Sequence, residues 1–326
     1  MMEQEFMEEV RSSIADYMGE DVVVTLNSIL KNNAIVLNGL SIMEKERSMA
    51  PTIYLDELYE QFQKGRDFSN IIYEIIGLYE KHKEGVDVDV DFFADYQKAK
   101  ERIVCKLVSY EKNEAFLKEV PYIRFLDLAV IFYCLVASDS IGSAVIIIYN
   151  RHMELWHITV EELYEKAKWN TRHLLGCQIK RLVDVLRENL IENMETDLPD
   201  LYEHCNEAGM TEEGTTEFIS GMVDHICGDE GEASMYVLSN QRQLNGAVCI
   251  IYPDVLADFA AEMEQDIYII PSSIHEVLLL PTREEDAAER LSEMVREVNS
   301  TQVEADEILA NHVYFYSRLN QKVSVL

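Results

Sequence analysis

The sequence predicts an α+β protein, in which mostly antiparallel sheets built from hairpins carry helices packed on them. Two observations lead to this fold class. Runs rich in Val, Ile and Tyr come in pairs separated by short turns, and each pair is followed by segments with apolar residues at helical spacing. This order recurs at 22–83, 122–189, 235–264 and 266–298. The four stretches are not visibly similar in sequence, so the architecture recurs without an internal repeat.

The first expected region, residues 1–118, begins with a helix and a hairpin. Phe6, Val10 and Ile14 recur at helical spacing, and Gly19 supplies a stop. Asparagine tolerates the left-handed backbone of a tight turn, so Lys31-Asn32-Asn33 predicts the turn of a hairpin. The two strands are expected over 22–29 and 34–43. Helices are expected over 2–18, 57–64, 68–83 and 92–110.

The second expected region, residues 119–191, holds a strand pair followed by helices. The strands are expected over 122–136 and 143–149, where Ile, Val and Tyr are frequent. Thr159 is a good N-cap for a helix to about Asn170, because two glutamates follow it in the first turn and favour the helix dipole. A further helix is expected over 176–189.

The third region, residues 192–234, is expected to be an acidic segment of helix and loop. No Lys or Arg occurs between Glu188 and Gln241, while Asp, Glu and Gly recur throughout. Such a one-sided composition indicates a surface insertion or a domain boundary.

The fourth region, residues 235–326, is expected to be α+β again. A hairpin is predicted over 235–239 and 246–252, and Pro253 fits the first turn of a helix to about Glu264. A strand, a turn and a second strand follow over 266–281. A charged helix over 283–298 and a final strand over 311–316 complete the expectation.

Composition narrows the class of protein. The chain has 326 residues, 48% of them apolar, and a formal net charge of −32. Such a charge repels nucleic acids and anionic membranes, so neither is an expected partner. An acidic mimic of nucleic acid remains an alternative, because carboxylates can be arrayed like phosphates.

The sequence also predicts a cytoplasmic location. The N-terminus is acidic without the apolar core of a secretion signal, and no apolar run approaches the ~18 residues of a membrane span. The six cysteines are scattered without a CxxC pair and are expected to be reduced thiols.

Several motifs resemble one known family. They are KNN at 31–33, LNGL at 37–40, PTIYL at 51–55, ITVEEL at 158–163, YVLSN at 236–240, NGA at 245–247, YPDVL at 252–256 and IIPSSIHEVLLLP at 269–281. Together they resemble the bacterial domain-of-unknown-function family 5688, over roughly residues 20–320. The resemblance implies an uncharacterised bacterial, cytoplasmic protein. It does not identify an active site, a cofactor or a catalytic residue.

The turn between the two strands of 266–281 has the densest cluster of reactive side chains. Ser272, Ser273, His275 and Glu276 lie side by side there. A serine and a histidine can form a nucleophile and its base, but neighbours within one turn rarely reach that geometry. Serines in a Pro-led turn more commonly bond to the local backbone. The cluster is therefore expected to be structural, with ligand binding and catalysis as alternatives.

Motifs with a known mechanism are missing from the sequence. There is no phosphate-binding glycine loop and no GxSxG, and no cofactor is expected. His275-Glu276 begins like HExxH, but Leu279 stands where the second histidine is needed. A weak candidate for a metal site consists of His204, Cys205, His225 and Cys227, whose spacing does not match a zinc knuckle.

Polar residues at the ends of predicted elements are candidates for ligand binding. They are Asn170, Arg172, His173 and Asn240, together with the turn residues Ser272, Ser273, His275 and Glu276. Lys180, Arg181 and Arg187 join Arg172 in one of the few basic patches. It either pairs with neighbouring carboxylates or binds an acidic group.

These observations favour a binding or interaction protein without catalytic activity, whose partner is a protein or a small molecule. The first alternative is a hydrolase-like enzyme that uses Ser272, Ser273, His275 and Glu276. The second is the acidic mimic of nucleic acid.

Overall fold

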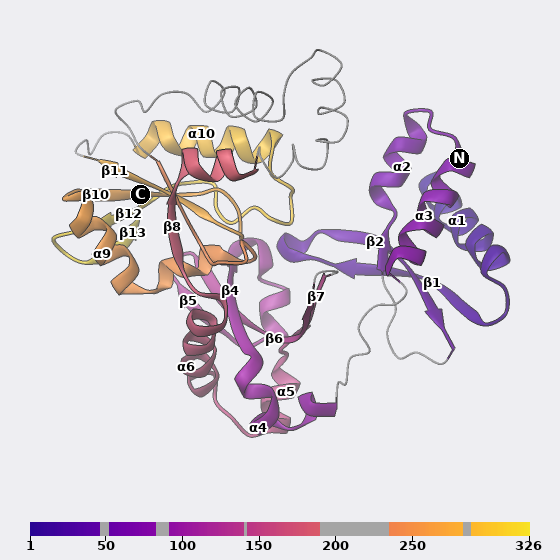
Figure 1. Cartoon of the computed structure of the whole chain (residues 1–326), viewed down its shortest axis with the longest axis horizontal. Helices are drawn as coiled ribbons and strands as arrows, with labels where there is room; N and C mark the ends of the chain where they lie inside the picture. The colour runs from indigo at the N-terminus through magenta and orange to yellow at the C-terminus, as the bar shows by residue number, and fades with distance from the viewer. Residues whose placement is uncertain (46–51, 83–90, 140–141, 190–234, 283–287) are drawn as a thin grey trace, which may run out of the picture. The chain divides into compact units, whose positions relative to one another are not determined.

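The computed structural model describes residues 1–45, 52–82, 91–139, 142–189, 235–282 and 288–326 (Figure 1). Helices and three sheets, of three, six and four strands, confirm the predicted α+β class. The chain divides into two compact units. Unit 1 comprises Met1–Cys105, Tyr110–Ile123 and Ile131–Asn170, and unit 2 comprises Lys106–Ser109, Arg124–Val130 and Thr171–Leu326. The four regions expected from the sequence stay a prediction.

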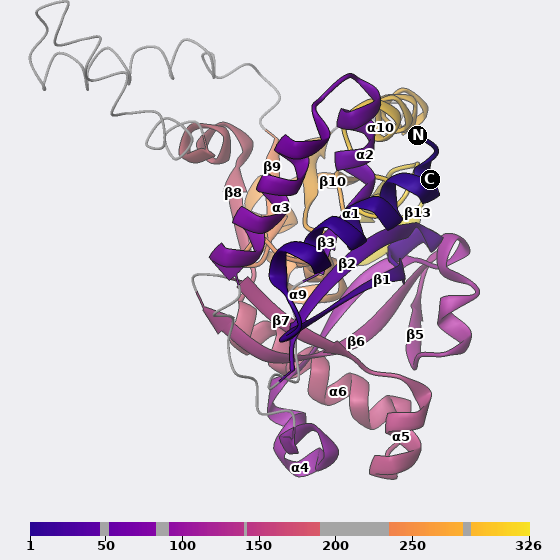
Figure 2. The same ribbon diagram turned by 90° about the vertical axis from the view of Figure 1, so that its right-hand side faces the viewer.

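The N-terminal part of unit 1 is a three-stranded sheet covered by helices. Its strands run in the order β1 (Val22–Leu30), β2 (Val36–Glu44) and β3 (Thr52–Tyr54), all antiparallel. Its helices are α1 (Glu3–Met18), α2 (Asp56–Gln63) and α3 (Phe68–His82) (Figures 1 and 2). These bounds confirm the predicted hairpin and the three predicted helices.

One face of this sheet carries the apolar core of that part. Val24 lies opposite Ile42 in the register, and both are buried, while Val23 on the other face is 44% exposed. Phe6 of α1 and Ile71 of α3 pack into the same core. The period-2 pattern of the strands and the 3.6-residue pattern of the helices therefore meet on a single face.

A four-stranded sheet follows in the chain, with the order β4-β6-β5 and β7 paired to β6. Its strands are β4 (Ile103–Ser109), β5 (Tyr122–Phe125), β6 (Leu128–Asp139) and β7 (Gly142–Ile147). The nearby helices are α4 (Tyr96–Ala99), α5 (Asn150–Trp156) and α6 (Val160–Asn170). At the start of α6, Thr159 Oγ1 accepts from the Glu162 amide at 3.2 Å, and Glu162 accepts from the Thr159 amide at 2.8 Å. This reciprocal cap confirms the N-cap predicted at Thr159.

The prediction of one helix over 92–110 is wrong. Short turns, η2 (Asp91–Ala94), α4 and η3 (Lys100–Arg102), end at Arg102, and β4 begins at Ile103. Most of β4 is buried, so its apolar residues fill consecutive positions instead of alternating. Such a short buried run has no periodicity that separates strand from helix.

Unit 2 contains a six-stranded sheet with the order β13-β12-β10-β11-β9-β8. The strands are β8 (Gln178–Arg181), β9 (Tyr236–Ser239), β10 (Asp266–Pro271), β11 (Val277–Thr282), β12 (Tyr314–Ser317) and β13 (Lys322–Val325). Every neighbouring pair is antiparallel. The strand-turn-strand predicted over 266–281 is thereby confirmed.

Helices cover both faces of this sheet (Figure 1). On one face, Tyr268 and Ile270 pack with Leu291 and Val295 of α10 (Ala288–Thr301). On the other face, the ring of Tyr236 lies 4.9 Å from that of Phe259 in α9 (Pro253–Met263). The sheet therefore forms the middle layer between α9 and α10.

Two further predictions in unit 2 need correction. The strand predicted over 246–252 is a buried 3-10 helix, η7 (Gly246–Ile251). Residues predicted as one helix over 176–189 form β8 first and a helix over 182–189 only afterwards. In both places the local apolar pattern is short, so pairing with β9 and burial under neighbouring segments decide the conformation.

Among the described residues, no helix has both the length and the apolar character that crossing a membrane requires. The acidic segment expected over 192–234 lies outside the described residues.

Candidate functional site

His275 joins three segments of unit 2 at the turn between β10 and β11. Its Nδ1 accepts from the Asn245 amide at 3.1 Å, and its Nε2 lies 3.2 Å from a carboxylate oxygen of Glu307. Its backbone oxygen accepts from the Ser239 hydroxyl at 2.8 Å. Both ring nitrogens are therefore bonded to groups that hold the turn in place.

Ser273 of the same turn bonds to the local backbone. Ser273 Oγ accepts from the backbone amide of His275 at 2.9 Å, as in a local serine turn. Within the described residues, neither Ser272 nor Ser273 is hydrogen bonded to the imidazole. Burial raises the pKa of Glu276, against the opposing charge of His275. This geometry favours a structural role for Ser273 and His275, and a catalytic role for the four residues stays a hypothesis.

Asn240 organises the loop that follows β9. Its side-chain oxygen accepts from the amides of Arg242 and Leu244 at 3.0 and 3.3 Å, and its amide donates to the Leu244 oxygen at 2.7 Å. Its backbone oxygen accepts from the Gln178 side chain at 3.1 Å. Asn240 is completely buried, and these hydrogen bonds satisfy its polar groups there. The bond from Gln178 also places it beside β8.

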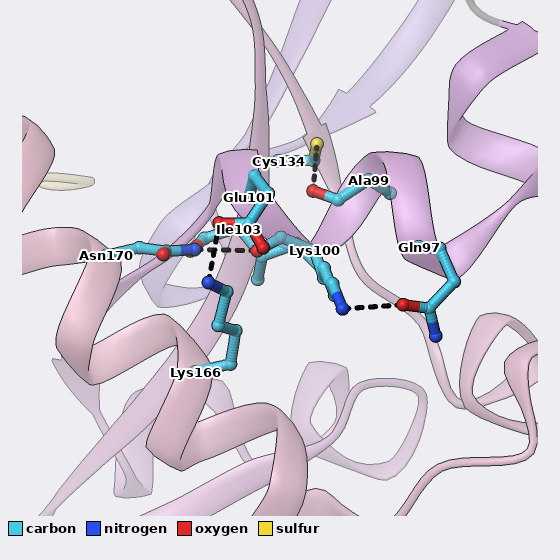
Figure 3. A network of polar contacts seen from close by, with 8 residues as sticks. All are labelled: Gln97, Ala99, Lys100, Glu101, Ile103, Cys134, Lys166 and Asn170. Carbon is cyan, nitrogen blue, oxygen red and sulfur yellow. Dashed lines mark hydrogen bonds and ion pairs between the residues drawn. The ribbon is translucent and has the colours of Figure 1, made fainter.

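Asn170, the last residue of α6, holds the start of β4 in unit 1 (Figure 3). Its side-chain amide donates to the carbonyls of Lys100 and Ile103, both at 2.7 Å. The side chain is fully buried, and these two bonds give its amide group the acceptors that it needs there. In the same network, the half-buried Lys166 pairs with the exposed Glu101 at 2.6 Å.

Arg172 and His173 lie on a π-helical turn, η6 (Thr171–Leu175). Such turns are frequent at functional sites, because they redirect side chains. Arg172 forms a two-pronged ion pair with Asp254 of α9, with distances of 2.8 and 2.5 Å. Its guanidinium also lies 5.4 Å from the centre of the Tyr252 ring. Both side chains of the ion pair remain partly exposed.

A cleft of about 940 Å³ opens next to Arg172 within unit 2. One wall is β8 with the helix 182–189, the other is α9, and Tyr236 of β9 contributes from the sheet. Four basic residues line it, namely Arg172, Lys180, Arg181 and Arg187. The predicted basic patch therefore gathers on one hollow surface, although the whole chain has only 28 Lys and Arg against 60 Asp and Glu.

Carboxylates balance these cations, as the first interpretation of the patch anticipated. Arg181 holds Asp184 with two bonds, of 2.9 and 3.0 Å, and Arg187 lies 3.4 Å from the same carboxylate. Lys180 pairs with Glu188 at 2.6 Å. These arginines hold the pKa of the exposed Asp184 below its usual range. The cleft also has apolar walls, formed by Ile179, Tyr236, Val255, Phe259 and Met263.

Cys177 also lines the cleft, and its sulfur lies 2.7 Å from that of Cys249. Sequence reasoning missed this pair, because 72 positions separate the two thiols and no CxxC spacing marks them. It also missed Asp254 as the partner of Arg172. Gly176 immediately precedes Cys177 in the sequence, and a glycine there is consistent with the sharp turn that the structure shows, with a φ of +70°.

The predicted residues thus separate into different places. Arg172 lies at the cleft, and Asn240 lies beside its β8 wall. Asn240 also lies near the turn 272–276, because the backbone at Gly246 packs against both the Asn240 nitrogen and the His275 oxygen. Asn170 makes its contacts in unit 1. His204, Cys205, His225 and Cys227 lie outside the described residues. Over the part of the chain that is described, no group of three or more His, Cys, Asp or Glu side chains is placed to hold a metal ion.

Comparison with known proteins gives one match. No curated protein and no solved structure matches this chain. The model of a family of unknown function, DUF5688, matches residues 3–318, which is nearly the whole chain and confirms the resemblance of its motifs. The chain therefore belongs to the family of unknown function DUF5688.

Proposed function

We propose that this protein is a bacterial, cytoplasmic binding protein without catalytic activity, and that its ligand occupies the cleft between β8 and α9. The observation that carries the proposal is the cleft itself, which combines four basic side chains with apolar walls. Its volume of about 940 Å³ lies within the range typical of small-molecule sites.

The lining indicates a small molecule with an apolar body and an anionic group. Tyr236, Phe259 and Met263 provide aromatic and aliphatic surface for the body. Arg181 and Arg187 converge on a single carboxylate, Asp184. Because a guanidinium has five N–H donors in a planar fork, it can hold a protein carboxylate and a ligand anion together. An anionic ligand would add to this ion-pair network without leaving a buried charge unpaired.

A titration with the dye 1-anilinonaphthalene-8-sulfonate tests this assignment, since the dye joins an apolar body to a sulfonate. We expect saturable binding to the folded chain at one site. Arg181→Met should weaken binding by about fivefold or more, because it removes a charge-assisted contact while keeping an unbranched apolar stem.

The matched control is Arg318→Met. Arg318 is exposed and lies in the same unit but does not line the cleft. Equal loss of dye binding in both variants would contradict the assignment, as would undiminished binding by the Arg181 variant. Circular dichroism must show that both variants keep the fold.

A further inference from the structure

We propose that Cys177 and Cys249 form a redox-active dithiol, which low-molecular-weight disulfides oxidise from the cleft by thiol–disulfide exchange. This inference concerns covalent chemistry at a residue that lines the cleft, and it does not depend on the ligand proposed above.

The geometry of the two thiols provides the first argument. Their sulfur atoms lie 2.7 Å apart, so nothing separates them and little movement is needed to join them. Cys177 directly precedes β8, and Cys249 lies in η7. The sulfur of Cys249 also lies 3.9 Å from the Gly176 oxygen, which fixes it beside the turn that presents Cys177.

Unequal access gives the two thiols different roles. Cys177 is partly exposed and lines the cleft, whereas Cys249 is completely buried. An entering disulfide therefore meets Cys177 first. Cys249 is within reach of the sulfur of Cys177 but not of solvent, which is the placement of a resolving thiol.

The surroundings of Cys177 favour its thiolate, the form that attacks disulfides. The hydrogen bond with Cys249 lowers the pKa of Cys177 most, and the charge of Arg172 adds to it. Burial and the charge of Asp254 act in the opposite direction, but the pKa stays below its usual value. Cys134 provides the contrast, because burial raises its pKa to about 12 and it is fully enclosed.

The exchange balances in two steps. The Cys177 thiolate attacks one sulfur of the external disulfide, forming a mixed disulfide and releasing one thiolate. The buried thiol of Cys249 then attacks the sulfur of Cys177, and its proton passes to the departing sulfur, which leaves as the second thiol. The two cysteines are oxidised to one disulfide, and the external disulfide is reduced to two thiols.

Oxidised glutathione serves as the probe on the full chain. Without reductant, trypsin should release residues 173–180 joined to residues 243–283, because each fragment contains one cysteine. Cys249→Ser should stop at the mixed disulfide and accumulate a glutathione adduct on Cys177. Cys177→Ser should give neither product.

Cys134→Ser is the control, and it should form the joined fragments as the wild type does. Cys249→Ala provides a second trapping variant if serine in the buried position unfolds the chain. We expect Cys177 to react at least about tenfold faster than Cys134, given their opposite pKa shifts.

The inference is overturned if the wild type forms no joined fragments. It is also overturned if other cysteines are linked first, or if both Cys249 variants leave Cys177 unmodified. Dye binding in the cleft is a separate readout, so either proposal can fail without the other.

Discussion

Asn170 demonstrates how one buried side chain fixes a boundary between elements. Its amide satisfies the carbonyls of Lys100 and Ile103, where the chain leaves short helical turns for β4. These partners lie 70 and 67 positions away, so no local pattern in the sequence reveals them. The residue was predicted to bind a ligand because it lies at the end of a helix, and that role stays untested.

Asn170→Asp should destabilise the protein by about 2–4 kcal/mol, because a carboxylate in this position faces two carbonyl oxygens and donates nothing. Urea unfolding at constant pH measures the effect. Lys166→Ala is the control from the same network, and it should change the unfolding free energy less, because an ion pair with a solvent-exposed carboxylate contributes little. A stability equal to that of the wild type for Asn170→Asp would contradict the structural role.

Glu276 predicts a dependence of stability on pH. Burial raises the pKa of this carboxyl in the folded chain above its ordinary value of 4.5. Folding therefore favours the protonated form. The stability that Glu276 contributes is fully present below the unfolded pKa, and it is lost as the pH rises through the folded pKa.

Glu276→Gln removes this titration and keeps the shape of the side chain. We expect the variant to be more stable than the wild type at pH 7, with the difference shrinking towards pH 4. Unfolding in urea across this range measures it. Glu293→Gln, at an exposed position of α10, is the control for the removal of one carboxylate charge. The expectation is contradicted if the advantage of Glu276→Gln over the wild type grows as the pH falls.

At the scale of elements, local rules succeeded where each element carries its own signals. The hairpin of β1 and β2 turns at η1, where Asn33 has a φ of +59°, and α6 starts at the cap predicted at Thr159. These structures depend on residues within a few positions of each other. The expectation failed for β4 and η7, whose conformations depend on partners distant in the sequence.

η7 illustrates the reason for such failures. Gly246 lies so close to the segments around it that an added Cβ would be 2.5 Å from the Asn240 nitrogen and 2.7 Å from the His275 oxygen. The Ala247 amide then donates to the Ile274 oxygen at 3.2 Å. The family motif with NGA at 245–247 and the turn 272–276 thus meet in space. Sequence spacing cannot show this meeting.

Gly246→Ala should therefore destabilise the protein by about 3 kcal/mol or more, because backbone atoms must move to admit one methyl group. Gly77→Ala is the matched control in α3, where a Cβ would meet nothing within 4 Å. It should stabilise the chain by up to about 1 kcal/mol, because alanine is the better helix former. Thermal unfolding of both variants checks the pair, and equal effects would disprove the close packing at Gly246.

At the scale of the whole molecule, the excess of negative charge destabilises the folded state. The chain has 60 acidic and 28 basic residues, and the cleft gathers four of the basic ones. Since like charges repel more strongly in the folded chain than in the expanded unfolded chain, the excess of carboxylates lowers stability. The sequence alone predicts this overall repulsion, but only the structure shows that four of the cations gather in the cleft.

Salt should therefore stabilise this protein. Raising NaCl from about 10 to 150 mM shortens the screening length from about 30 to 8 Å, which weakens the repulsion among carboxylates. We expect the Tm at pH 7 to rise over this range and then to level off, because ion pairs in the cleft are screened in the same way and offset part of the gain. Sucrose at matched osmolarity controls for effects that do not depend on charge. A Tm that falls with NaCl would mean that ion pairs, such as that of Arg172 with Asp254, outweigh the net repulsion. The stability of the folded chain would then rest on where its few cations lie and not on how many carboxylates it carries.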